Sequence, residues 1–422
     1  MTRIIIISAN SFGPSSNGLT LKNLFNGWNK DNLAQFYIQN EFPDFSFCSN
    51  YHNVTDYNAL KSIFSGEKFT DHINNISEAN IKKSNADNSL LKNPLTMLLR
   101  TFIWMTNRWK GKKFNDWLDK FNPDIIFIDI GDNPAQIKLT RDISRKKNIP
   151  IVIYNTEAYY FFNENYMLNS PKWTNYFYPI FRSVLHYQFK KIMEESSAII
   201  HGCDKLKILY DKEFTTNSFV IYNSSNIKFP EYKIESSNNL KISYLGNLGL
   251  HRPKALVEFA DVLKEINSNQ KIEIYGSCTN EAEKRLLENH SNIIYNGVVC
   301  YDKVLNIINK SDILIHVESS EMPKQQIEYG FSTKIADSLA SGRCFFIYAP
   351  DYIACYQYLN SNIPEVTASN KEELKYKLNK IISESAFRKQ CANKCLQLSE
   401  KNHSTEYNKT KLNRIIDDII RT

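Results

Sequence analysis

Two segments in the second half of the sequence place cations at the start of a predicted helix, just after a glycine turn. In the first, YLGNLGLHRPKALVEF (244–259), Gly246 and Asn247 follow a β-branched strand. Arg252 and Lys254 then open a helix that has proline in its first turn. Helix amides and two cations that converge on one point suit a phosphate group. A solvated basic loop in front of an ordinary helix is the alternative.

The second segment is EYGFSTKIADSLASGR (328–343). Ser332 or Thr333 is placed to cap a helix, and Lys334 lies near its positive end. Asp337, on the next turn, could accept hydrogen bonds from ribose hydroxyls. A capped helix whose acid has a charge partner at i, i+4 is the alternative. The presence of two such elements in one predicted domain favours a nucleotide site.

The elements that must position these residues follow an α/β pattern, because short β-branched runs alternate with helical segments. The expected strands lie at 3–9, 124–130, 149–155, 197–202, 241–246, 271–276, 292–297, 312–317 and 343–349. We predict two tandem Rossmann-like domains that face a central cleft, with ligands at the carboxyl ends of the strands. The expected parts are an N-terminal domain (1–222), a linker (223–239), a second domain (240–400) and a C-terminal helix (401–422).

Composition narrows the class of protein. The chain has 422 residues, a net charge of +7 and eight scattered cysteines, among which Cys391 and Cys395 have no partnering Cys/His cluster. We therefore expect a reduced, cytoplasmic protein without structural zinc, and not a dedicated nucleic-acid binder. No apolar run approaches the roughly 20 residues that span a bilayer. His201 and His316 end apolar strands and are expected to be satisfied near-core residues.

The stretch 240–350 resembles the donor domain of the group 1 glycosyltransferases, which are retaining enzymes of the two-Rossmann GT-B class. That family carries an E-x7-E pattern around EGFGxxxxEAMAxG. Aligning Gly330 and Phe331 with its Gly-Phe puts Asp337 at the second acid, the ribose ligand. Tyr329 stands at the first acid, so that Glu328, one residue early, or Glu321 is left to hold the donor sugar.

The resemblance also implies ligands for the donor diphosphate. Lys254 matches the family's lysine, and Arg252 substitutes for the arginine whose usual position Asn247 occupies. Ser332, Thr333 and Lys334 would bind the diphosphate from the second helix. Catalytic roles accordingly fall to Lys254, Arg252 and Glu328, which leaves Gly246 and Asn247 with donor binding. The sequence contains no D-x-D pair, so that cations and helix ends would stabilise the leaving group without a metal ion.

Candidate residues in the first half are less specific. Gly18 lies in a Ser/Asn loop after the first strand, where the resemblance implies a place under the donor phosphates or at the acceptor. An ordinary capped turn is the alternative. Asp129, Asp132 and Glu157 lie at predicted strand ends that face the cleft and are either acceptor-binding carboxylates or loop caps.

Residues 93–118 combine six nearby basic residues with an apolar pattern. Asn93 and Pro94 mark a helix start, and an apolar stripe follows at Leu95, Leu98, Phe102, Met105 and Trp109, widened by Leu99 and Ile103. This pattern suits either an anionic membrane surface or a core helix with a solvated basic end. The first reading adds a peripheral membrane location on the inner face of the plasma membrane.

The sequence therefore predicts a hexosyltransferase-type enzyme that moves a sugar from a nucleoside-diphosphate donor, UDP favoured, to a glycan or lipid-linked saccharide of a bacterial surface polysaccharide. No cofactor is expected beyond this donor substrate. One alternative is a nucleotide-sugar epimerase of the same fold. The other is a non-catalytic nucleotide-sugar or membrane-binding subunit with a degenerate donor site.

Overall fold

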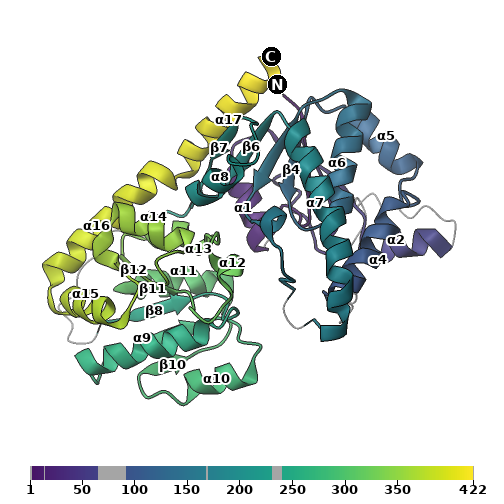
Figure 1. Ribbon diagram of the computed structural model, residues 1–422. Helices are drawn as coiled ribbons and strands as arrows, with labels where there is room; N and C mark the ends of the chain where they lie inside the picture. Colours follow the sequence, from purple (N-terminus) through teal and green to yellow (C-terminus); the bar gives the residue numbers. More distant parts are fainter. Residues whose placement is uncertain (1, 14, 65–91, 168–169, 231–239, 422) are drawn as a thin grey trace. The chain divides into compact units, whose positions relative to one another are not determined.

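The computed structural model describes residues 2–13, 15–64, 92–167, 170–230 and 240–421 (Figure 1). Its contacts divide the chain into two compact units. Unit 1 comprises Met1–Ile221 and Lys409–Thr422, and unit 2 comprises Tyr222–Asn408.

Unit 1 contains a parallel sheet of seven strands in the order β3-β2-β1-β4-β5-β6-β7. All four strands predicted for this half are present. The sequence did not predict β2, β3 or β7. The strands are β1 (Ile4–Ser8), β2 (Leu33–Tyr37), β3 (Asn50–Asn53), β4 (Ile125–Ile130), β5 (Ile151–Asn155), β6 (Ala198–His201) and β7 (Ser218–Val220).

Helices cover both faces of this sheet, which is why its strands are apolar on both sides (Figure 1). On one face, Ile4 and Ile6 of β1 join a buried cluster with Phe25 and Leu412. The helical elements of unit 1 are α1 (Ser16–Leu24), η1 (Lys30–Asn32), α2 (Asp56–Phe64), α4 (Pro94–Met105), α5 (Lys112–Phe121), α6 (Pro134–Lys147), η3 (Tyr159–Phe161), η4 (Lys172–Phe177), α7 (Tyr178–Glu195), α8 (Asp204–Tyr210) and most of α17 (Thr405–Arg421).

Unit 2 repeats the architecture with six parallel strands in the order β10-β9-β8-β11-β12-β13. The chain reverses its direction of strand addition between β8 and β11, so that the loops after these two strands border the crevice where such sheets bind ligands. The strands are β8 (Ile242–Leu245), β9 (Ile272–Tyr275), β10 (Ile293–Tyr295), β11 (Ile313–Val317), β12 (Cys344–Tyr348) and β13 (Thr367–Ala368).

The helical elements of unit 2 pack around this sheet and enclose one core. They are α9 (Arg252–Ile266), α10 (Glu281–Glu288), α11 (Tyr301–Lys310), α12 (Lys324–Ile327), α13 (Lys334–Ala340), α14 (Ala354–Asn362), η5 (Pro364–Val366), α15 (Lys371–Ser383) and α16 (Ser385–Asn402).

The C-terminal helix does not stand apart as its own segment. From Lys409 onward it belongs to unit 1, where Leu412, Ile415 and Ile416 are buried. Within the expected linker, residues 231–239 lie outside the described residues. The boundary by contacts, between Ile221 and Tyr222, lies one residue before the predicted end of the first domain at 222.

Candidate functional site

The center of the candidate site is an ion pair between the loops that follow β8 and β11. Arg252, the first residue of α9, donates from Nε and Nη2 to the two carboxylate oxygens of Glu318, at 3.1 and 2.8 Å. His316 Nε2 lies 3.0 Å from Glu318 Oε1, and Arg252 Nη1 donates to the carbonyl oxygen of Asn247 at 3.3 Å. The guanidinium is therefore held in one orientation by both loops.

The carboxylate of Glu318 is ionised although it is buried. Burial by itself raises its pKa, but the hydrogen bond from His316 and the positive charge of Arg252 outweigh that effect and lower the pKa to about 2. A bidentate carboxylate–guanidinium pair of this kind is both strong and geometrically specific. His316 is the satisfied near-core residue that the sequence predicts.

A second cation, Lys334, opens α13 beside this pair. Partial burial lowers its pKa, and the positive charge of Arg252 lowers it further, whereas Glu318 and Asp337 act in the opposite direction. The side chain nevertheless stays solvent-accessible. The two cations are close enough for their charges to interact, so that an anion near them would be attracted by both.

Asp337 lies one turn further along α13, close to Ser225 and Lys334. Burial raises its pKa, opposed by a hydrogen bond with Ser225 and by the charge of Lys334. The predicted caps are only partly observed: Thr333 occupies the N-cap position, but its side chain makes no capping hydrogen bond. The carbonyl oxygen of Ser332 accepts from Ile335 N at 3.2 Å. Contact of Asp337 with a ribose stays a prediction.

Lys254 lies in the first turn of α9 and forms an ion pair with Glu321. It lines a pocket of about 270 Å³ at the carboxyl ends of β11, β12 and β13. Glu318 also lines this pocket, whereas Arg252, Lys334 and Asp337 are not among its lining residues. The other lining residues are Ala255, Glu258, Ser319, Ser320, Glu321, Tyr348, Ala349, Pro350, Asp351, Ser369 and Asn370.

The glycine turn after β8 depends on a residue that the sequence analysis missed, Gly276 after β9. A Cβ atom at Gly276 would lie 1.7 Å from the carbonyl oxygen of Gly246, so that only glycine allows this approach. Gly246 N donates to Tyr275 O at 2.9 Å, and Asn247 Oδ1 accepts from Gly249 N at 2.7 Å. These contacts shape the loop that delivers Arg252.

Glu318 was also missed as a site residue. The signal that could have found it is an acid at the end of a predicted strand, the same signal that singled out Asp129 and Asp132. By contrast, Glu328 is the C-cap of α12, 3.9 Å from Lys324 Nζ, and does not line the pocket. Its role as the sugar-binding acid stays a prediction.

Gly18 lies in the first turn of α1 in unit 1. A Cβ atom there would lie 2.4 Å from Ser11 O, and Gly18 N donates to the Ser15 hydroxyl at 3.2 Å. These contacts are those of a tight capped turn, and its predicted part in binding stays a prediction.

The three candidate carboxylates of unit 1 lie close enough for their charges to interact: Asp129 is in β4, Asp132 follows β4 and Glu157 follows β5. Burial raises the pKa of Asp129 to about 7 and, with the charge of Asp132, that of Glu157 to about 7. Asp132 accepts from the Tyr166 hydroxyl at 2.8 Å and pairs with Lys92 at 2.5 Å. The cap of α6 is supplied not by these acids but by the next residue, Asn133.

Neither a metal site nor a membrane-spanning helix is found among the described residues. No group of three or more His, Cys, Asp or Glu side chains among them is placed to hold a metal ion. Within the same residues, no helix has the length and apolar character needed to cross a membrane. Metal independence stays a prediction.

Comparisons with known proteins bear on the fold. No protein-family model and no curated protein matches the sequence. Sucrose-phosphate synthase from Thermosynechococcus elongatus superimposes with a TM-score of 0.65 at 10% identity, over 100% of both chains. An E. coli trehalose-6-phosphate structure bound with UDP-2-fluoro glucose gives 0.61 at 11% identity, over 100% of this chain and 99% of the other. Anabaena HepE in complex with UDP and glucose gives 0.57 at 11% identity, over 99% and 100%. The chain therefore has the α/β fold of the GT-B glycosyltransferases, two Rossmann-like units in tandem, as the sequence predicts.

Proposed function

We propose that this chain is a glycosyltransferase whose unit 2 binds the diphosphate of a nucleotide sugar between α9 and α13. The observation that carries the proposal is the pair of cations at the reversal point of the sheet. Arg252 is fixed by ionised Glu318, and its charge lowers the pKa of neighbouring Lys334. A diphosphate placed between them would relieve their repulsion and satisfy guanidinium and ammonium donors together.

The same cations would act on the reaction. Cleavage of the sugar–phosphate bond leaves negative charge on the departing diphosphate, and preorganised cations stabilise that charge as it develops. Arg252 needs little reorganisation because Glu318 and the loop carbonyl of Asn247 already hold it. Lys254 would exchange Glu321 for a phosphate oxygen, and Asp337 would exchange Ser225 for ribose hydroxyls.

We further propose UDP as the nucleotide and a glycan or lipid-linked saccharide as the acceptor. Two proteins of this fold were solved with UDP or a UDP-sugar bound, which supports testing UDP first. Retention of anomeric configuration and a role in surface polysaccharide synthesis come from the sequence resemblance. A front-face reaction of that kind requires no protein nucleophile.

A non-catalytic nucleotide-sugar-binding subunit is the second candidate. The specific observation in its favour is that Tyr329 stands at the first acidic position of the family pattern. Such a protein would bind the nucleotide without turning over its sugar.

Calorimetric titration of the full chain with UDP, GDP, CDP and NAD, without added metal, tests the site. We expect one nucleoside diphosphate to bind and Lys334→Ala to weaken it at least tenfold, whereas Lys389→Ala, an exposed lysine on α16, leaves affinity unchanged. Binding of NAD alone, or equal binding by the Lys334 variant, would refute the site. Incubation with the matching nucleotide sugar and release of the diphosphate then separates an enzyme from a binding subunit.

A further inference from the structure

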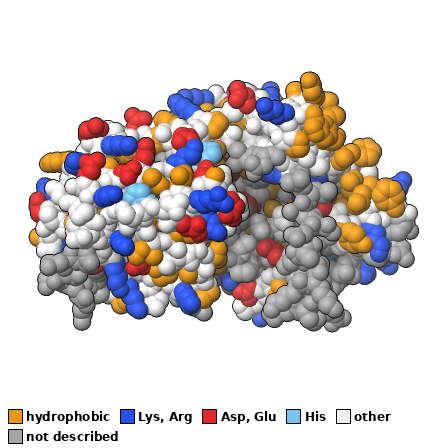
Figure 2. All heavy atoms as spheres, turned by 90° about the horizontal axis from the view of Figure 1, so that it is seen from below, with side chains coloured by type: hydrophobic (Ala, Val, Ile, Leu, Met, Phe, Trp, Pro, Cys, Tyr) orange, Lys and Arg blue, Asp and Glu red, His pale blue; other side chains and the backbone are white. Residues whose placement is uncertain are grey.

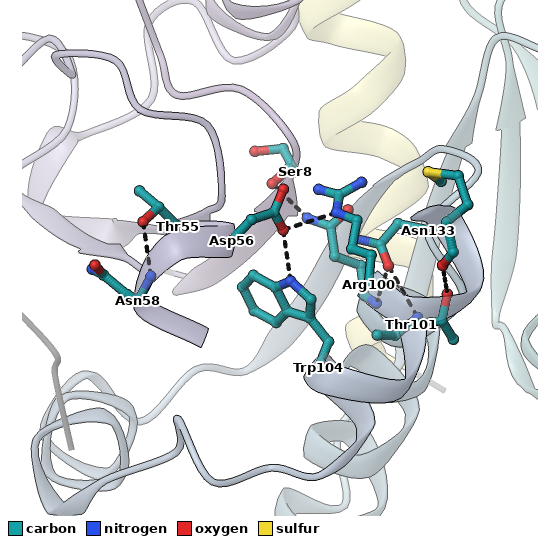
Figure 3. Close-up of polar contacts among 11 residues, drawn as sticks. Ser8, Thr55, Asp56, Asn58, Arg100, Thr101, Trp104 and Asn133 are labelled. Atoms are coloured by element: carbon teal, nitrogen blue, oxygen red, sulfur yellow. Dashed lines mark hydrogen bonds and ion pairs between the residues drawn. The ribbon is translucent and has the colours of Figure 1, made fainter. Parts of the chain in front are cut away.

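The outer surface of unit 1 around α4 has apolar side chains where a surface helix ordinarily has polar ones. Helix α4 packs against α2, α6, α7 and η4. Asp56 of α2 accepts hydrogen bonds from Arg100 Nε at 2.8 Å and from Trp104 Nε1 at 2.7 Å, which ties α2 to α4 (Figure 3). Met97 and Trp104 lie on the buried side of α4, whereas Leu99 and Phe102 on its outer side do not contribute to the core.

Three apolar stripes with the same spacing lie on these neighbouring elements. Each stripe has residues at i, i+3 or i+4, and i+7. On α2 and α4 this spacing places the members on one helical face, whereas the third stripe runs from the 3-10 helix η4 into α7. The most exposed members are Phe64 (82%), Phe102 (70%) and Tyr176 (82%). The three stripes together, called here the α4 face, are Tyr57, Leu60 and Phe64 of α2, Leu95, Leu99 and Phe102 of α4, and Trp173, Tyr176 and Ile180 of η4 and α7.

Hydrophobic side chains are gathered at the right-hand end of the view in Figure 2, over unit 1. Single exposed apolar residues are ordinary, but a gathering of large ones across adjacent elements marks an interaction surface. The sequence predicts a different stripe, and that prediction is wrong for Trp109. The helix ends at Met105, and Trp109 is buried beyond it, 1% exposed.

The described residues of α2, α4 and η4 carry a small excess of positive charge. Among the described residues of α2, α4 and η4 the single acid is Asp56, and Arg100 pairs with it. Lys61 and Lys172 lie on the same elements, and the sequence has no acid between Glu164 and Glu194. This balance is complementary to an anionic surface.

We propose that the α4 face docks on an anionic lipid surface, with its aromatic and aliphatic side chains at the level of the headgroups. Trp and Tyr favour that depth because one part of each ring system is apolar and another is a hydrogen-bond donor. Basic residues around an apolar face add electrostatic attraction to anionic lipids. The inference goes beyond the proposed function and does not depend on the nucleotide site of unit 2.

Flotation of the full chain with lipid vesicles tests this proposal. We expect binding to vesicles of 70% phosphatidylcholine and 30% phosphatidylglycerol, at least tenfold weaker binding to phosphatidylcholine alone, and weakening by salt. Phe102→Ser combined with Trp173→Ser should reduce binding at least tenfold. Tyr376→Ser, which removes an aromatic residue of unit 2 that is 71% exposed, should not. Lys172→Glu should weaken binding, whereas Lys389→Glu on α16 should leave it unchanged.

Three results would overturn the proposal. The first is failure of the wild-type chain to float with anionic vesicles, and the second is equal binding by the Phe102/Trp173 variant. The third is a lipid-free oligomer, seen by analytical ultracentrifugation, that this variant dissociates, because the face would then be a protein interface. Circular dichroism melting of each variant verifies that the fold is retained.

Discussion

Neutralising Glu318 gives the sharpest test of how the candidate site is held together. The carboxylate has a pKa of about 2 in the folded chain, against an ordinary value of 4.5. A difference of about 2.5 pH units corresponds to roughly 3 kcal/mol of folding free energy at neutral pH. Because the folded pKa is lowered, this stabilisation is complete above pH 4.5 or so and is lost as the pH falls toward 2.

We therefore expect Glu318→Gln to lower the free energy of unfolding at pH 7 by roughly 3 kcal/mol, since it leaves a buried guanidinium without its counterion. The loss should shrink as the pH falls from 4.5 toward 2, because the wild-type carboxylate is then protonated as well. Urea unfolding followed by circular dichroism at several pH values measures both effects.

The matched control is Glu321→Gln, which removes an exposed acid paired with Lys254 and should leave stability nearly unchanged. Equal stability of Glu318→Gln and the wild type at pH 7, or a loss that does not depend on pH, would refute the assignment of Glu318 as the ionised clamp of Arg252.

Three further predictions concern other residues. Affinity for a nucleoside diphosphate should fall as the pH rises toward the lowered pKa of Lys334, below the ordinary 10.5, and Lys334→Ala should remove this dependence in titrations across pH 7 to 10. Gly276→Ala should lower the free energy of unfolding, measured in urea, by about 2–4 kcal/mol, because its Cβ would overlap the carbonyl oxygen of Gly246. The control Gly131→Ala should be neutral, since a Cβ there has nothing within 4 Å. An unaffected Gly276 variant would contradict the loop geometry. Asp129→Asn should stabilise the chain at pH 8 by up to about 4 kcal/mol and have little effect at pH 4. The reason is that the pKa of Asp129 is raised in the folded chain, so that the wild type loses stability as the pH rises from 3.8 toward 7. Equal effects at both pH values would argue against a raised pKa.

Local sequence patterns were sufficient for most of the scaffold. Runs such as IIII at 4–7 and IIFI at 125–128 are apolar at every position, and only strands with both faces covered require that. The start of α4 could also be predicted from neighbouring residues, because Asn93 forms a capping box with Thr96 and Pro94 fits the first turn. The sequence did not predict strand β2, because Gln35 interrupts its apolar run. In the fold this amide is buried and satisfied by the Ser8 hydroxyl and Phe12 N, at 2.9 and 2.8 Å.

Local sequence was enough for the fold class and for the helix starts at which Arg252, Lys254 and Lys334 lie, because strand burial and helix starts are encoded within a few neighbouring residues. Tertiary structure decided how the site is assembled, since the partner of Arg252 lies 66 positions away, at the end of a strand paired with β8. It also decided that Gly276 must be glycine and that residues 409–422 belong to unit 1. Tertiary packing also determined which side of α4 faces outward. Periodicity defines an apolar stripe on a helix, but only the packing of neighbouring elements determines whether that stripe is buried or exposed.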